Sequence, residues 1–89
     1  EAHMRQLAFE MSDRGITVNC VQAGVTDTPA LRKIPGNNDM IAEAKRRNPS
    51  GRITEPEDVG DTVALLSKDE TDFITGNIIR CDGGEGIVS

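Results

Sequence analysis

The chain has 89 residues and a formal net charge of −5, with 15 acidic against 10 basic side chains, and it contains neither Tyr nor Trp. This composition argues against nucleic-acid binding, which needs clustered cations, and the basic run at 45–47 fits the last turn of a helix. No apolar run approaches the roughly 20 residues of a membrane-spanning helix, and His3, Cys20 and Cys81 lack metal-ligand spacing. We expect no membrane, nucleic-acid or metal contact, and two buried, reduced thiols in a cytoplasmic protein.

A helix followed directly by a strand is predicted at the start of the chain. Residues 2–13 carry apolar side chains at the i, i+3, i+4, i+7 spacing of an amphipathic helix, namely Met4, Leu7, Ala8 and Met11. Residues 16–21 form a short, β-branched run that suits a buried strand. A helix that leads straight into a strand indicates an α/β fold.

The sequence changes character after this strand. Ala23-Gly24 breaks the strand, and Thr28 stands before a proline suited to the first turn of a helix. Residues 29–48 then form two short helical pieces, joined by a turn at 35–38 and ended by Asn48-Pro49. A broken helical insertion after the end of a strand is typical of a lid over a binding cleft; an ordinary surface connection is the alternative.

A second helix and a second strand follow. Thr54 and Glu57 have the spacing of a capping box at the start of a helix, and residues 77–81 form an apolar strand. Residues 82–84, Asp-Gly-Gly, end that strand sharply, and we expect no helix after the glycines at 83, 84 and 86, so they are not the dinucleotide-binding turn. A strand–helix–strand unit favours parallel pairing, and two parallel strands need neighbours. The helical pattern already runs at Glu1, so we expect a sequence cut from a longer chain.

Three further polar residues have structural roles by the same reasoning. Asn19, within the first strand, is expected to bond neighbouring backbone. Arg52 is expected to be a structural anchor rather than a substrate ligand, and Asp82 a turn residue that accepts backbone amides.

Six segments in this order carry a family resemblance: "RGITVN", "AGVTDT", "PSGRITEPEDVG", "ALLS", "FITGNII" and "CDGG". Together they resemble the C-terminal third of short-chain dehydrogenases/reductases, over nearly the whole chain. The stretch "VTDTPALRKIPG" is most similar to bacterial acyl-carrier-protein reductases. The resemblance implies the C-terminal part of a doubly wound parallel, Rossmann-like sheet, with residues 1–89 in one domain and residues 29–48 as its helical substrate lid.

The resemblance also implies three cofactor-binding positions, Gly24, Thr26 and Thr28. Gly24 stands in the family's Pro-Gly turn beside the nicotinamide, although Ala23 replaces the proline here. Thr26 replaces an aliphatic residue whose backbone contacts the nicotinamide carboxamide. Thr28 matches a threonine whose hydroxyl bonds the carboxamide or the pyrophosphate; the alternative, which does not exclude that role, is a cap for the helix at Pro29.

The family's catalytic serine, tyrosine and lysine are expected upstream of Glu1, so no catalytic residue is assigned within the chain. The resemblance implies NAD or NADP as cofactor and hydride transfer between the nicotinamide and a carbonyl or enoyl substrate. The narrower similarity implies a 3-oxoacyl or enoyl thioester on acyl carrier protein as that substrate. It also implies a homotetramer, built from the helix that ends at Arg14, the 55–68 helix and the 77–81 strand. The alternative is a non-catalytic α/β assembly module complete in these 89 residues.

Overall fold

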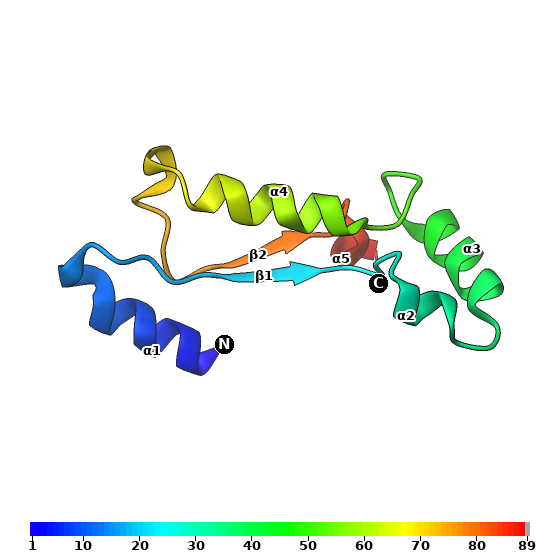
Figure 1. The fold of residues 1–89 in the computed structure, drawn as a ribbon, viewed down its shortest axis with the longest axis horizontal. Coiled ribbons are helices and arrows are strands. Elements are labelled where there is room, and N and C mark those ends of the chain that lie inside the picture. The colour runs from blue at the N-terminus through cyan, green and yellow to red at the C-terminus, as the bar shows by residue number, and fades with distance from the viewer. Residues whose placement is uncertain (89) are drawn as a thin grey trace.

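The computed structural model describes residues 1–88, which form five α-helices and two β-strands (Figure 1). The helices are α1 (Ala2–Met11), α2 (Pro29–Arg32), α3 (Asn37–Arg47), α4 (Pro56–Leu66) and α5 (Glu85–Val88), and the strands are β1 (Cys20–Ala23) and β2 (Ile78–Cys81). Short 3₁₀ turns follow α1 at Ser12–Arg14 and α4 at Asp69–Thr71. The predicted α/β class is confirmed, and so are the two helical pieces within residues 29–48.

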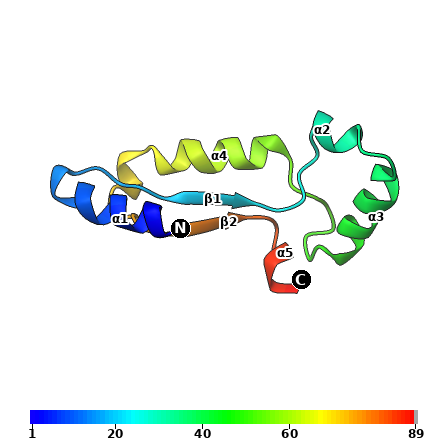
Figure 2. The same cartoon turned by 90° about the horizontal axis from the view of Figure 1, so that it is seen from below.

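The two strands pair in parallel, with Cys20 opposite Ile78 and Ala23 opposite Cys81. Helix α4 lies along one face of this pair and α1 along the other, as the two views show (Figures 1 and 2). Helices α2 and α3 lie beyond the carboxyl ends of the strands, and α5 follows the end of β2. Helices on both faces of a parallel sheet define the doubly wound α/β class, which is the predicted one.

Strand β1 begins later than predicted. The sequence indicated a strand over 16–21, whereas the structure pairs 20–23. The residues before Cys20 face the turn that precedes β2 and not a strand: the Val18 N–H donates to Thr75 Oγ1 (3.0 Å), and the Gly76 N–H donates to the Val18 carbonyl (2.8 Å). A strand extends only as far as it has a partner strand to hydrogen-bond with. The β-branched run therefore did not predict where β1 begins and ends.

Asn19 has the predicted structural role. Its Nδ2 donates to the Ile74 carbonyl (2.9 Å), and its Oδ1 accepts from the Asn77 N–H (3.1 Å). The side chain thus fastens the approach to β1 onto the approach to β2.

The start of helix α4 is displaced by one residue from its predicted position. The predicted capping box was Thr54 with Glu57, but Glu55 is the N-cap, and its N–H donates to Asp58 Oδ2 (2.8 Å). Thr54 is only 4% exposed and forms a parallel bridge with Thr26, so it lies inside the fold and not at a helix end. The tertiary bridge therefore overrides the local capping signal.

Arg52 and Asp58 form the ion pair that holds this helix start. The Arg52 guanidinium donates to both carboxylate oxygens (2.7 and 3.0 Å) and to the Ile53 carbonyl (3.1 Å), which confirms Arg52 as a structural anchor. These hydrogen bonds from Arg52, together with the Glu55 N–H, lower the pKa of the Asp58 carboxyl from its ordinary 3.8 to about 2.

The stability that Asp58 contributes should vanish in acid. Because its pKa is lower in the folded state, the contribution is complete above pH 3.8 and disappears as the pH falls towards about 2. Urea unfolding across this range should show that Asp58→Asn is destabilising near neutral pH and indistinguishable from the parent at the acid end. Asp61→Asn, an exposed site on the same helix, is the matched control. A difference that stays constant with pH would contradict the assignment.

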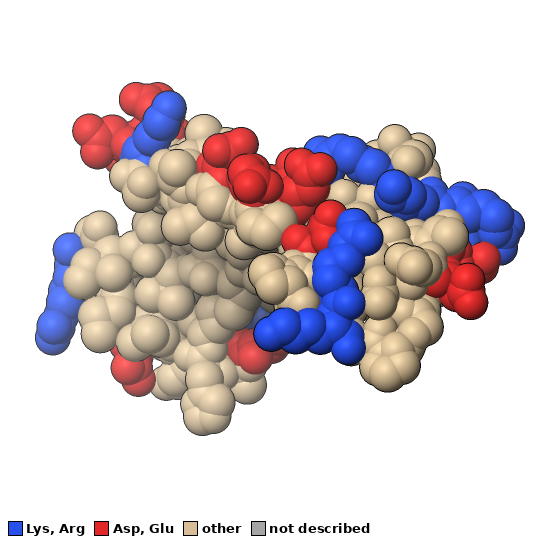
Figure 3. All heavy atoms as spheres, turned by 45° about the vertical axis from the view of Figure 1, so that its right-hand side comes forward, with Lys and Arg blue, Asp and Glu red and all other residues tan. Residues whose placement is uncertain are grey.

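The strand pair leaves much apolar surface uncovered. The accessible surface is 6421 Å² for 9.6 kDa, whereas a compact monomer of this mass exposes about 5,100 Å². The radius of gyration is 15.6 Å, against about 12 Å for a compact domain. Phe73 is 98% exposed and Phe9 83%, and Figure 3 shows a broad area without charged side chains. The exposed surface is what a two-stranded part of a larger sheet would present.

The structure bears on the expectations about membrane spans, metal sites and the two thiols. Within residues 1–88, no helix combines the length and the apolar character that crossing a bilayer requires. The same stretch holds no cluster of three His, Cys, Asp or Glu side chains that could bind a metal ion. Cys20 and Cys81 are free, half-buried thiols, and the strand register sets them three residue positions apart.

Candidate functional site

The three residues predicted to bind a cofactor lie in one loop, 24–28, which continues from the end of β1. Gly24, Thr26 and Thr28 are all half-buried there. Because parallel strands end on the same edge of a sheet, the turn after β2 reaches this loop, and α2 and α3 extend beyond it (Figures 1 and 2). In open parallel sheets ligands bind in the crevice at the carboxyl ends of the strands. This edge is the candidate site.

Thr26 presents a free backbone donor and acceptor. Its parallel bridge to Thr54 uses the Val25 carbonyl, which accepts from the Thr54 N–H (3.0 Å), and the Asp27 N–H, which donates to the Thr54 carbonyl (2.8 Å). In such a bridge the N–H and C=O of Thr26 itself point to the opposite side, and neither is bonded within residues 1–88. Its hydroxyl turns back to donate to the Gly24 carbonyl (2.8 Å). The Thr26 N–H and C=O could therefore bond the oxygen and the NH₂ group of a planar amide.

Gly24 is pressed against the first turn of α5. A Cβ added at this position would lie 2.6 Å from Glu85 Oε2 and 3.0 Å from Asp82 Cβ. The same Glu85 carboxylate accepts from the Val25 N–H, at 3.1 and 3.2 Å to its two oxygens. Glycine at this position leaves room for a contact within the chain. Glu85 could not be identified from the sequence, because it lies 60 residues from Val25.

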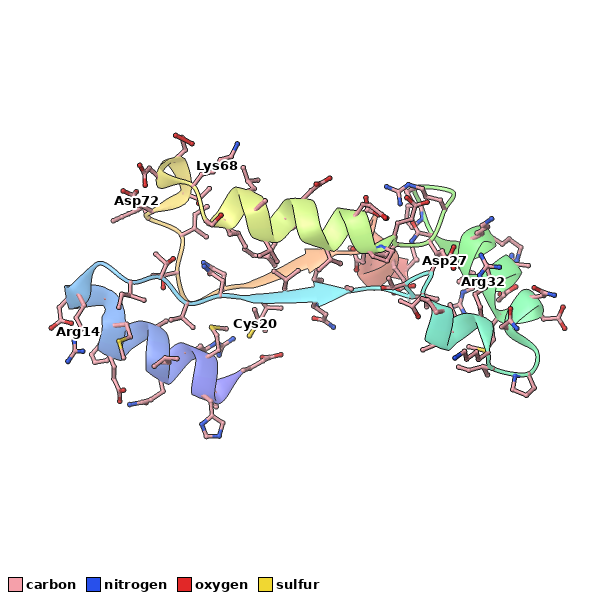
Figure 4. The ribbon with its side chains drawn as sticks, in the orientation of Figure 1. Arg14, Cys20, Asp27, Arg32, Lys68 and Asp72 are labelled. Carbon is pink, nitrogen blue, oxygen red and sulfur yellow. The ribbon has the colours of Figure 1, made fainter. Side chains whose placement is uncertain are left out.

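Thr28 caps helix α2. Its Oγ1 accepts from the Leu31 N–H (3.2 Å), while the hydroxyl hydrogen stays available as a donor. Beside it, Arg32 binds both oxygens of Asp27 (2.8 and 3.0 Å), as Figure 4 shows for the two labelled side chains, and the resulting hydrogen bond lowers the pKa of the Asp27 carboxyl. The capping role that the sequence offered as an alternative is thus present, and a second bond to a ligand is compatible with it.

The C-terminal end of α3 is fixed to the turn after β2 by Asn48. This side chain is 6% exposed, its Nδ2 donates to the Asp82 carbonyl (2.9 Å), and its Oδ1 accepts from the Ser50 N–H (2.9 Å) and hydroxyl (2.7 Å). The sequence identified Asn48 only as the end of a helix. A buried asparagine has no sequence signature, because its partner lies 34 residues away.

The turn after β2 differs from its prediction in one respect. Asp82 accepts from the Gly84 N–H (3.0 Å) and the Gly86 N–H (2.9 Å), which confirms it as a turn residue. The expectation that no helix follows the glycines was wrong, since α5 begins at Glu85. The Asp82 carboxylate satisfies amides at the start of α5, so a single helical turn forms where the sequence pattern was too short to indicate one.

A cavity of about 420 Å³ lies between this loop and α3. It is lined by Val25, Met40, Glu43, Ala44, Arg47, Glu85 and Val88. Its volume is that of a site for a small molecule. Val25 is the residue of the loop 24–28 that lines the cavity, so a group bound there would lie beside the loop.

Comparisons with known proteins bear on this site. A family model described as "Enoyl-(Acyl carrier protein) reductase" matches residues 1–85. The BbsD subunit of (2S)-((R)-hydroxy(phenyl)methyl)succinyl-CoA dehydrogenase from Thauera aromatica is 35% identical over 83 residues, which cover 93% of this chain and 33% of that protein. The 3-oxoacyl-(acyl-carrier-protein) reductase of Thermotoga maritima is 38% identical over 77 residues, 86% of this chain and 30% of that protein.

A solved structure of an acyl-carrier-protein reductase is similar to this chain as well. The enoyl-acyl-carrier-protein reductase of Bacillus cereus, crystallised with NADP⁺ and an indole naphthyridinone, superposes with a TM-score of 0.87 at 33% identity. The superposition covers 99% of this chain and 34% of that one. The chain thus spans about a third of the length of the relatives it matches.

Proposed function

The chain belongs to the short-chain dehydrogenase/reductase family, and on that basis we propose that residues 1–89 are the C-terminal portion of a Rossmann-like domain in an NAD(P)-dependent oxidoreductase. The nicotinamide supplies the hydride chemistry when it is bound. This chain supplies the loop that holds the nicotinamide end of the cofactor and the lid, residues 29–48, that covers the substrate. The relatives above are named as a dehydrogenase and as acyl-carrier-protein reductases.

The observation that carries this proposal is the N–H and C=O of Thr26, just beyond the carboxyl end of β1, neither of which is bonded within residues 1–88. A nicotinamide carboxamide has one acceptor and one donor in a plane, and a single extended residue can bind both. The hydroxyl of Thr28 then donates to the carboxamide or to the pyrophosphate while it caps α2. Gly24 contributes indirectly, because the absence of a side chain leaves room for the Glu85 carboxylate. That carboxylate accepts from the Val25 N–H and so holds the backbone next to Thr26.

The proton-transfer residues are assigned to the part of the oxidoreductase outside this chain. In the family, a tyrosine assisted by a lysine and a serine donates the proton, and this chain has no Tyr. The contribution of residues 1–89 is then to position the cofactor and to exclude water from the reacting carbon.

For the substrate, we propose a 3-oxoacyl or enoyl thioester carried on acyl carrier protein. The cavity of about 420 Å³ has Val25, Met40, Ala44 and Val88 among its lining residues, which gives an acyl chain an apolar wall. The match to a family model described as an enoyl reductase and the 38% identity to a 3-oxoacyl reductase support this choice.

We also propose a homotetramer for the oxidoreductase. Large apolar side chains are exposed on two helices of the described structure: Leu7 and Phe9 on α1 are 42% and 83% exposed, and Val63 and Leu65 on α4 are 54% and 53% exposed. Those that the rest of the sheet leaves uncovered would be buried between subunits. Sedimentation of the full-length protein tests this point.

The test of the proposed function is cofactor binding and turnover by the full-length oxidoreductase. Excess NADH or NADPH should raise its melting temperature, because a ligand that binds only the folded state stabilises it. Reduction of a 3-oxoacyl or enoyl thioester should consume that cofactor. If neither nucleotide changes the melting temperature, the non-catalytic assembly module is favoured instead.

A pair of substitutions at Thr28 sharpens this test. Thr28→Val removes the hydroxyl and should weaken cofactor binding about tenfold, the effect of one lost hydrogen bond, whereas Thr28→Ser should retain it. Equal cofactor affinity in both variants would leave Thr28 with its capping role alone.

A further inference from the structure

We propose that Asn48 is a positioning residue for substrate binding: it fastens the C-terminal end of the lid to the turn after β2 and so holds the wall of the substrate cavity in place. The anchoring consists of contacts within this chain. Its effect on substrate binding rests on the proposed function.

Asn48 has the contacts of an anchor. Its side chain is one of two polar side chains buried among residues 1–88; the other is Thr54, 4% exposed. The hydrogen bond from Asn48 Nδ2 to the Asp82 carbonyl joins the lid to the sheet, and the two bonds from Ser50 to Asn48 Oδ1 hold the amide in orientation. Loss of a buried bond of this kind leaves a desolvated group unpaired, which is costly.

The turn that receives Asn48 is shaped for the contact. A Cβ at Gly83 would lie 2.7 Å from Ser50 Oγ and 3.0 Å from Asn48 Oδ1, and a Cβ at Gly84 would lie 3.2 Å from Pro49. The backbone of the turn thus lies flat against residues 48–50, and the bonds from Gly84 and Gly86 to Asp82 fix its form. The anchor is therefore a rigid one.

The rest of the lid has little else to hold it. On α3 the only buried side chain is Ile41, 6% exposed, and the link between α2 and α3 is exposed from Lys33 to Gly36. The first end of the lid is held by the bridge at Thr26. The second end depends on Asn48, which directly follows α3.

Movement at Asn48 changes the substrate cavity. Met40, Glu43, Ala44 and Arg47 of α3 form one wall of it, and Val25, Glu85 and Val88 form the remainder. When the anchor is lost, α3 samples positions away from that wall. The apparent affinity for substrate then falls in proportion to the fraction of lids that remain in place.

The experiment compares Asn48→Asp with Asn38→Asp in the full-length oxidoreductase. Both changes replace an amide by a carboxylate, but Asn38 is exposed in the first turn of α3, so it controls for an added charge elsewhere on the lid. Asn48→Asp loses the donor to the Asp82 carbonyl and sets a carboxylate against it. We expect the KM for the thioester substrate to rise about tenfold, with kcat and the dissociation constant of the cofactor unchanged, and Asn38→Asp to match the parent. Hydrogen exchange should quicken in α3 and not in α4.

Separate outcomes test the anchor and the function. Unchanged exchange in α3 would overturn the anchor itself, whereas faster exchange with an unchanged KM would overturn its role in substrate binding. An oxidoreductase that consumes no nicotinamide at all would refute the proposed function, yet the exchange measurement would still decide the anchor. If Asn48→Asp fails to fold, Ser50→Ala is the milder variant. It removes the hydroxyl's bond to Asn48 Oδ1 and its bonds with the Arg52 backbone. Hydrogen exchange in α3 should then quicken to a smaller degree.

Discussion

Replacing Gly83 by alanine should lower the free energy of unfolding by about 2–4 kcal/mol, the largest effect expected from a single methyl group in this chain. Gly83 has φ +64°, a left-handed conformation that opposes a side chain. The new Cβ would also lie 2.7 Å from Ser50 Oγ and 3.0 Å from Asn48 Oδ1. The two costs add because backbone strain and steric overlap are independent.

Gly51→Ala separates these two costs. Gly51 has φ +81° and no atom within 4 Å of the Cβ position. Alanine there should therefore lower the free energy of unfolding only through backbone strain, by about 1–2 kcal/mol. Urea unfolding of both variants in the full-length protein measures the difference. If Gly83→Ala is no worse than Gly51→Ala, then residues 48–50 do not pack on the turn as described. The Asn48 anchor would fail with them.

Gly24→Ala should destabilise by about 1–3 kcal/mol for a purely steric reason. Gly24 has an ordinary backbone conformation, but its Cβ would overlap the Glu85 carboxylate at 2.6 Å and crowd Asp82 Cβ at 3.0 Å. Glu85 must move, and it then loses its bonds to the Val25 N–H. Under the proposed function the loop shifts beside Thr26, so cofactor affinity should fall as well.

Two companion variants test this explanation. Gly60→Ala, in helix α4 with no atom within 4 Å, should stabilise by about 0.5–1 kcal/mol, because alanine favours a helix more than glycine does. Glu85→Ala combined with Gly24→Ala removes the overlap with the carboxylate, so the double variant should be more stable than the sum of the single effects. Strict additivity would mean that Glu85 does not occupy the space over Gly24.

Local sequence signals predicted the elements well where neighbouring residues decide the outcome. The apolar spacing of residues 2–13 gave helix α1, and the proline at 29 gave the start of α2. The predictions failed at boundaries set by distant partners. The strand predicted at 16–21 lies at 20–23 because its partner begins only at Ile78, and the capping box moved from Thr54 to Glu55 because Thr54 bridges Thr26.

The sequence by itself determined the family, through six motifs in order, and with it came the expectation that a cofactor binds at the loop 24–28. Each motif is a run of adjacent residues, and adjacency is what a sequence records. Only the tertiary structure decided how that loop and helix α3 are held, by Glu85 on the Val25 amide and by Asn48 on the Asp82 carbonyl. Those contacts join residues 60 and 34 positions apart. They exist because parallel strands end at one edge of the sheet, where the loops that follow them must meet.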